Sequence, residues 1–190
     1  MNTDWQTDAL PELAQRILAR LQQAYGTISD PWRLPVLATL GPEGPDARVV
    51  VLRDVLKEGR ELVAFSDRRA PKIAQIHQHS RIALVFYDGA GPVQLRIHGQ
   101  AGVQEASDME RWAGLSDAQR QNYRSLATPG TPVDSPSEGW STTNRSGLEE
   151  FAVVRIKVET LDWLWLARAG HRRAQFTWEA GGWSGRWVVP

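Results

Sequence analysis

Cysteine is absent from the 190-residue sequence, which excludes disulfide bonds, thiolate catalysis and cysteine-ligated metal sites. An excess of one charge is also absent, because 22 basic side chains balance 22 acidic ones. A globally basic nucleic-acid-binding protein is therefore not expected. No apolar run approaches the roughly 20 residues of a membrane span, and the first residues lack the pattern of a signal peptide. These absences predict a cytoplasmic protein that binds neither membranes nor nucleic acid.

Several common catalytic and binding motifs are missing as well. The sequence has no dinucleotide-binding glycine pattern, no Walker A motif and no serine-hydrolase elbow. Among its four histidines, His77 and His79 lie two residues apart in an expected helix, so they point in different directions and do not form a metal pair. We expect no metal site, and no side chain is assigned as a catalytic acid, base or nucleophile.

Hydrophobic periodicity predicts a single domain that is mainly β, with flanking helices. It divides into an N-terminal helix over 8–26, a barrel over 33–104, short helices and a long loop over 107–147, and C-terminal strands over 150–190. Residues 48–55 are expected to form one buried strand. Residues 151–167 are expected to form two strands, before a final hairpin. Closure removes exposed sheet edges, so this pattern favours a closed or nearly closed β-barrel.

Tryptophan is unusually frequent, with nine residues in the chain. The last 28 residues contain Trp163, Trp165, Trp178, Trp183 and Trp187. A tryptophan-rich core or subunit interface would explain them. Alternatively, one or two pack beside a flat aromatic ligand.

The stretch RVVVLRDV, residues 48–55, places Arg48 and Arg53 at the ends of an apolar run. Buried guanidinium groups need an anion to meet them. Together with Ser66 and Lys72 at a helix start, these arginines describe a phosphate pocket. The alternative is that each arginine pairs with a carboxylate such as Asp54 or Glu61.

The order of these residues resembles the pyridoxamine 5′-phosphate oxidase family of flavoproteins. The chain shows R-x-V-x-L-[KR] from Arg48, then Phe65-Ser66, then Lys72 six residues after the serine, then Gln94. Its segment DWLWLARAGHRRAQF, residues 162–176, resembles the tryptophan-containing segment that closes the family's sequences. Within the family, the chain is most similar to the oxidase-related, FMN-binding branch.

This resemblance implies an FMN-binding split β-barrel that forms a homodimer with FMN at the subunit interface. We expect Arg48 at the phosphate. The resemblance implies that Arg53 lies nearer the ring and the substrate. Side chains alternate along a strand unless it twists or bulges, so the two arginines point to opposite faces, and Arg48 is the favoured phosphate contact. The cofactor contacts implied by the resemblance are Arg48, Val49, Val50, Val51, Leu52, Arg53, Phe65, Ser66, Lys72, Gln94, Trp165 and Gln175. The implied substrate contacts are Arg53, His171 and Arg173.

Three departures from the family pattern bear on the substrate. The usual Ser-Arg-Lys reads Ala70-Pro71-Lys72, and the closing Arg-x-His-x-Arg becomes His171 through Gln175. Residues 107–147 lack the Tyr-x-x-x-Arg-x-x-x-Ser motif. We therefore expect an FMN-dependent oxidoreductase that moves a hydride from a small anionic substrate, but not pyridoxamine 5′-phosphate oxidation itself. The 127–147 loop, with Trp140, is expected to cover the site. The alternatives are an NAD(P)H-dependent flavin reductase and a non-catalytic FMN-binding protein.

Overall fold

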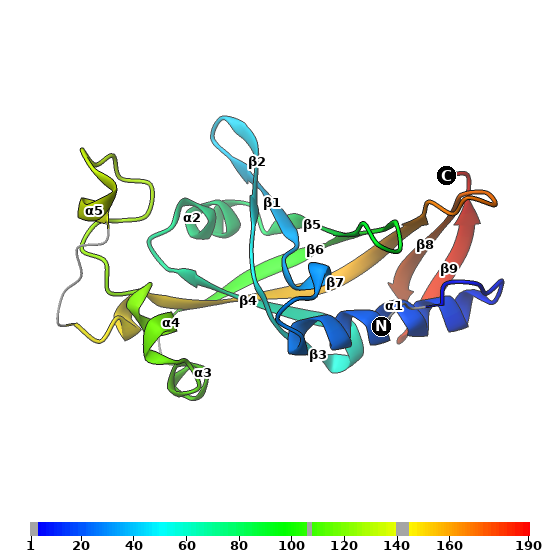
Figure 1. Ribbon diagram of the computed structural model, residues 1–190, viewed down its shortest axis with the longest axis horizontal. Helices are drawn as coiled ribbons and strands as arrows, with labels where there is room; N and C mark the ends of the chain where they lie inside the picture. Colours follow the sequence, from blue (N-terminus) through cyan, green and yellow to red (C-terminus); the bar gives the residue numbers. More distant parts are fainter. Residues whose placement is uncertain (1–3, 106–107, 140–144) are drawn as a thin grey trace.

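The computed structural model describes residues 4–105, 108–139 and 145–190. A long antiparallel sheet dominates the fold, and helices lie along it and at one end (Figure 1). The strands are β1 Val36–Gly41, β2 Gly44–Val49, β3 Leu52–Leu56, β4 Glu61–Asp67, β5 Arg81–Asp88, β6 Val93–Glu105, β7 Phe151–Trp165, β8 Arg172–Glu179 and β9 Gly182–Val188. The helices are α1 Leu10–Gly26, α2 Pro71–Gln78, α3 Met109–Ala113, α4 Asp117–Gln121 and α5 Pro136–Gly139, with 3₁₀ turns η1 Pro31–Arg33, η2 Lys57–Gly59 and η3 Leu148–Glu150.

Strand pairing leaves the sheet open. The hydrogen-bonded order is β2-β1-β5-β6-β7-β4-β3, and β8 and β9 extend the sheet from β7. One edge of β7 pairs with β6, whereas the other pairs first with β4 and then with β8. The mainly β fold with flanking helices is confirmed, but the expectation of a closed or nearly closed barrel is wrong. Among the described strands, β2 and β3 lie at the two ends of this order. They are consecutive in the sequence, and a short connection after Val49 links them.

The stretch RVVVLRDV forms two strands, and its expected single strand is wrong. β2 ends at Val49, the Val50 N–H donates to the Pro35 carbonyl at 2.9 Å, and β3 begins at Leu52. The chain crosses here from one end of the sheet order to the other. A bulge at Arg53 then shifts the register between β3 and β4. The backbone therefore changes direction within residues 48–53. The side chains of this segment do not alternate between two faces as they would along one continuous strand.

The core lies on the face of the sheet that α1 covers. Leu13, Ile17 and Leu21 fall on one side of α1 and are fully buried, as the helical spacing predicted. They belong to one apolar cluster with Leu95 and Trp163. On each long strand the intervening side chains point to the opposite face, which we call the outer face. Trp163 is therefore a core residue.

The C-terminal half of the chain confirms some of the expected elements and contradicts others. Residues 151–165 form one long strand, so the two strands expected over 151–167 are wrong. The final hairpin is confirmed as β8 and β9. The long loop contains the short helix α5, and the expectation for Trp140 lies outside the described residues. In the described part of the chain, no helix is long and apolar enough to cross a membrane.

Candidate functional site

Ser66 and Lys72 come together where β4 ends and α2 begins. Asp67 organises the turn between them, since its carboxylate accepts from the Arg69 N–H at 2.8 Å and its carbonyl accepts from Ala70. Pro71 is favourable in the first turn of α2. The Lys72 ammonium donates to the Ser66 hydroxyl at 3.1 Å. We call Arg48, Ser66 and Lys72 the Lys72 cluster.

The Lys72 ammonium is well suited to meet an anion. Burial lowers its pKa, and the positive charge of Arg48 lowers it further, against weaker opposing effects of Asp67 and Asp46. Within the described residues, Ser66 is the sole hydrogen-bond partner of the ammonium, and no carboxylate lies within ion-pairing distance. A partly buried cation without a counter-ion is unfavourable until an anion reaches it. The cluster therefore has the charge and hydrogen-bonding capacity for a phosphate group.

Arg48 also belongs to this cluster, but protein groups already surround its guanidinium. Nη1 donates to the Thr39 hydroxyl at 2.5 Å and to the Leu37 carbonyl at 3.4 Å. Nη2 donates to Gln75 Oε1 at 3.1 Å and forms an ion pair with Asp46. The four N–H groups on its two terminal nitrogens thus each have a partner. Arg48 therefore has to give up one of these four contacts before Nη1 or Nη2 can bind a phosphate.

Arg53 lies at the bulge of β3 and is half-buried. Its guanidinium carbon is 5.4 Å from the centre of the Phe65 ring, and its buried Nε has no hydrogen-bond partner in the described ranges. Burial lowers its pKa, and the nearby charge of Arg33 contributes in the same direction. The neighbouring Asp54 pairs instead with Arg111 at 2.9 Å. Salt-bridge pairing therefore explains Arg48, but it does not explain Arg53 or Lys72 among the described residues.

The remaining expected site residues lie on β6, β7 and β8. Gln94 and Arg173 flank Leu164 of β7 in register, and Trp165 pairs with Arg172. His171 is exposed just before β8. Arg173 donates to Asp162 at 2.9 and 2.8 Å, and Gln175 donates to the same carboxylate at 3.1 Å. Arg96 is a third donor, at 2.5 Å.

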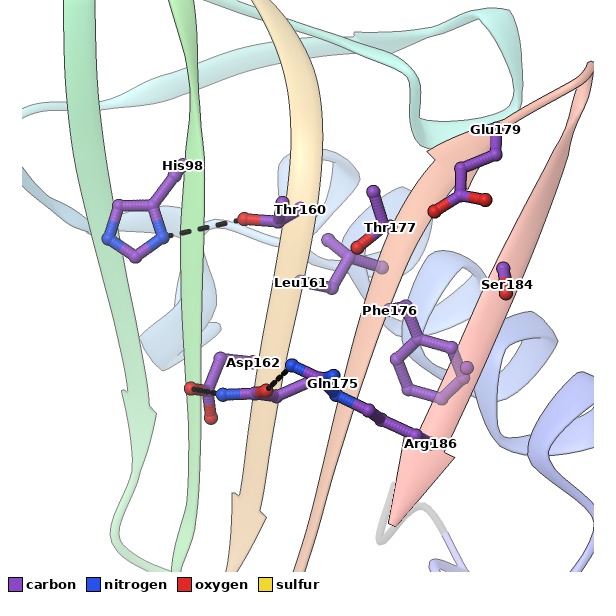
Figure 2. Close-up of a pocket in the computed structure, with 11 residues that line it drawn as sticks. His98, Thr160, Leu161, Asp162, Gln175, Phe176, Thr177, Glu179, Ser184 and Arg186 are labelled. Atoms are coloured by element: carbon purple, nitrogen blue, oxygen red, sulfur yellow. Dashed lines mark hydrogen bonds between the residues drawn. The ribbon is translucent and has the colours of Figure 1, made fainter. Parts of the chain in front are cut away.

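Asp162 is the centre of this second group. Burial opposes ionisation of its carboxyl, but hydrogen bonds from Arg173, Gln175 and Arg96 outweigh it and lower the pKa to about 2. A hollow of about 340 Å³ lies beside it. Figure 2 shows Asp162, Gln175 and Arg186 in a row across three strands of this hollow. Asp162 therefore holds Arg173 and Gln175 in place, so both can meet a ligand only through their remaining polar atoms.

The two groups lie far apart in one chain. Ser66 pairs with Ala152 near the start of β7, whereas Gln94 pairs with Leu164 near its end. Twelve positions of strand separate these partners, which corresponds to about 40 Å. Figure 1 shows the same separation, with α2 toward one end of the sheet and β8 and β9 at the other. A small ligand held by Ser66 and Lys72 therefore does not reach Gln94 of the same chain.

Several residues at the site did not stand out in the sequence. Thr39, Asp46 and Gln75 surround Arg48, and Asp162 organises the second group. Asp162 offered one signal, because it is a lone acidic residue between Leu161 and Trp163 in an apolar strand. Thr39, Asp46 and Gln75 offered none, since their contacts depend on how α2 packs against β1.

Comparison with known proteins identifies the class of fold. The structure matches a pyridoxamine 5′-phosphate oxidase-related, FMN-binding protein from Nostoc punctiforme with a TM-score of 0.76 and 22% identity, over 97% of this chain and 100% of that one. It also matches PhzG from Burkholderia lata 383, solved in complex with tetrahydrophenazine-1-carboxylic acid, with a TM-score of 0.72 and 19% identity, over 94% of this chain and 91% of that one. The fold is thus that of the FMN-binding split barrels, as expected.

The sequence comparison finds a related family over part of the chain. Residues 15–105 match the family model described as pyridoxamine 5′-phosphate oxidase, FMN-binding domain. The chain is 32% identical to a pyridoxine/pyridoxamine 5′-phosphate oxidase from Rubrobacter xylanophilus over an alignment of 128 positions, and this match covers 52% of this chain and 58% of that protein. Residues 15–105, just under half of the chain, are thus similar to this family's FMN-binding domain, and the resemblance predicted from the sequence is confirmed.

Proposed function

We propose that the protein binds FMN in a site formed by two copies of the chain and acts as an FMN-dependent oxidoreductase on a small anionic substrate. The Lys72 cluster carries this proposal. It combines the Ser66 hydroxyl with a partly buried ammonium that has no carboxylate partner among the residues that the structure describes, and it lies in the segment that matches the FMN-binding domain. This arrangement suits the phosphate group that distinguishes FMN from riboflavin.

The residues of the site have separable roles in this proposal. FMN supplies the hydride-accepting chemistry when it is bound. Lys72 and Ser66 hold its phosphate, Arg48 adds positive charge beside them, and residues 49–52 form the chain segment along which the cofactor lies. Arg53, above the Phe65 ring, orients an anionic group of the substrate or the polar edge of the cofactor. No side chain of the chain is required as a general base.

A homodimer would bring the two separated groups together. Gln94, Trp165 and Gln175 lie toward the end of β7 opposite to the Ala152 partner of Ser66, and His171 lies just before β8, so they would reach the cofactor held by the partner subunit. The outer face of the sheet offers a surface for this association. Val49 is 60% exposed and Val36 is 36% exposed. Both stand in one row across seven strands, made of Val49, Val36, Val85, Arg96, Asp162, Gln175 and Arg186.

An anionic substrate is favoured by Arg53, which has no carboxylate partner in the described part of the chain. The named compounds of the related proteins are also anionic, being a phosphate ester in one case and a carboxylic acid in the other. Arg173 replaces the family's histidine and is bound by Asp162. We therefore propose a substrate other than pyridoxamine 5′-phosphate.

Purified protein mixed with FMN would test this proposal. We expect one FMN per chain, with the flavin absorbance bleached anaerobically by an anionic reducing substrate and restored in air. Bleaching by NAD(P)H alone would instead support a flavin reductase. Stable FMN binding without bleaching by either class would support a non-catalytic FMN-binding protein. Failure to bind FMN would overturn the cofactor assignment.

A further inference from the structure

Asp46 places a carboxylate against Arg48 at the margin of the Lys72 cluster. The two residues are two positions apart on β2, so their side chains share one face of the strand. They form an ion pair in which the Arg48 side chain is 20% exposed and that of Asp46 is 49% exposed. The carboxylate is therefore the outer member of the pair, accessible to a ligand that arrives from solvent.

The other partners of Arg48 are fixed by the core. Thr39 and Gln75 are 4% and 6% exposed, and the Thr39 hydroxyl donates to Gln75 Oε1 at 2.6 Å. The Leu37 carbonyl belongs to β1. Breaking any of these contacts would leave a buried polar group unpaired. Asp46 is the most exposed partner of Arg48, and a ligand that displaces it has to break or replace one further contact, the hydrogen bond from Gln75 Nε2 to the same carboxylate.

We propose that Asp46 is a resident counter-anion that competes with the FMN phosphate for Arg48 and so limits how strongly the protein prefers FMN over riboflavin. This inference rests on the proposed FMN binding. Without ligand, the carboxylate offsets the repulsion between Arg48 and Lys72. When a phosphate approaches, the same carboxylate repels it and occupies one N–H group of Arg48. Lys72, which has no carboxylate partner among the described residues, remains the first contact of the phosphate.

The test compares Asp46→Asn with the wild-type protein, using FMN and riboflavin as separate ligands. Asparagine keeps an oxygen that can accept the 3.0 Å hydrogen bond from Gln75 Nε2 but removes the negative charge. We expect FMN to bind about fivefold more tightly, the scale of a partly exposed ion pair, while the riboflavin dissociation constant stays unchanged. The gain should shrink at high ionic strength, because salt screens partly exposed charges. A merely structural role would not produce this selectivity.

Asp117→Asn is the matched control, because it removes one negative charge from an exposed ion pair with Arg124. It should leave the ratio of the FMN and riboflavin dissociation constants unchanged. An unchanged or reduced preference for FMN in Asp46→Asn would overturn the inference while leaving the proposed function intact. If the wild-type protein binds neither flavin, the proposed function fails, and this inference fails with it.

Inorganic phosphate provides a second measurement. Its own dissociation constant, obtained from competition with FMN after correction for the FMN affinity of each protein, should be lower for Asp46→Asn than for the wild-type protein, and an equal phosphate dissociation constant would contradict the inference. Asp46→Ala serves as a second variant should the asparagine variant fail to fold, and its folded state is checked by circular dichroism. It should show the same increase in preference for FMN, and an unchanged preference would overturn the inference.

Discussion

Lys72 and Arg53 differ from the other basic residues of the candidate site in how their charge is balanced. Arg48 has Asp46 and Arg173 has Asp162 as an ion-pair partner. Among the described residues, neither Lys72 nor Arg53 has a carboxylate within ion-pairing distance. Partly buried cations of this kind are unfavourable alone and become favourable when an anion binds. Ligand binding should therefore respond most strongly to changes at these two residues.

Lys72→Ala should weaken FMN binding by about 1–3 kcal/mol, the range for hydrogen bonds to charged groups. It should leave riboflavin binding unchanged, because the lost contact is to the phosphate. Titration of each flavin, followed by its fluorescence, measures both constants. An equal loss for both ligands would show that the substitution disrupts the site as a whole.

The pH dependence of FMN binding should report Lys72 directly. Burial and Arg48 lower the pKa of its ammonium below the ordinary value for lysine, and the charged form binds phosphate. FMN affinity should therefore fall as pH rises through this lowered pKa, while riboflavin affinity does not. Lys72→Arg is the control, since arginine stays charged. If this variant shows the same alkaline loss as the wild-type protein, another group is responsible.

Asp162 should make folding stability depend on pH in acid. Its pKa is lowered from 3.8 to about 2 in the folded protein, so its contribution is complete above pH 4 and is lost as pH falls toward 2. The shift corresponds to about 2 kcal/mol. Urea unfolding at several pH values should show that Asp162→Asn is less stable at pH 6 and that the difference disappears near pH 2. Asp134→Asn, an exposed control, should show little difference at either pH.

The contacts that could be predicted at the residue scale were the local ones. Ser66 and Lys72 are six residues apart and meet through one turn, so their spacing alone was informative. The pairing of Arg173 and Gln175 with Asp162 depends on the register between β7 and β8. A single sequence does not specify that register. The resemblance alone placed both residues at a ligand, and their pairing with Asp162 was not predicted.

Among the elements, α1 at Leu10–Gly26 lies close to its predicted range of 8–26, and the final hairpin forms as predicted. The errors fall where a strand changes partner. RVVVLRDV divides because its two halves pair with β1 and β4, at the two ends of the sheet order. β7 stays continuous because β6 accompanies it along its length while β4 and β8 share its other edge. Hydrophobic periodicity describes burial, and it contains no information about which strand lies alongside.

Gly99 marks the bulge between β6 and β7 and should be intolerant of a side chain. A Cβ atom there would lie 2.1 Å from the Lys157 carbonyl oxygen, whereas one at Gly102 on the same strand would have no atom within 4 Å. Gly99→Ala should therefore lower the free energy of unfolding by about 3 kcal/mol, because backbone atoms must move. Gly102→Ala is the matched control and should change it by less than about 1 kcal/mol. Equal effects of the two substitutions would contradict this role for the bulge.

For the whole molecule, the distance between the two groups of site residues is the main constraint. The Lys72 cluster and Trp165 lie near opposite ends of β7, so a site that uses both needs two chains. We expect the two chains to associate through the outer face, where Val36 and Val49 are exposed. Val36→Asp would put a charge on this face, and it should shift the protein toward monomers in analytical ultracentrifugation and weaken FMN binding together. Loss of the dimer with full FMN binding would show that one chain suffices.

Mixed dimers provide the most direct test of a shared site. A dimer of Lys72→Ala chains lacks the phosphate contact at both sites. A dimer of Trp165→Ala chains lacks, at both sites, the tryptophan contact that the partner subunit supplies. A dimer with one chain of each kind has one site with both contacts and one with neither. Refolding the two variants together should therefore restore tight FMN binding to about one site per mixed dimer, because two-fold symmetry places the same pair of surfaces at each site. Binding that stays as weak as in the separate variants would mean that each chain holds its cofactor alone.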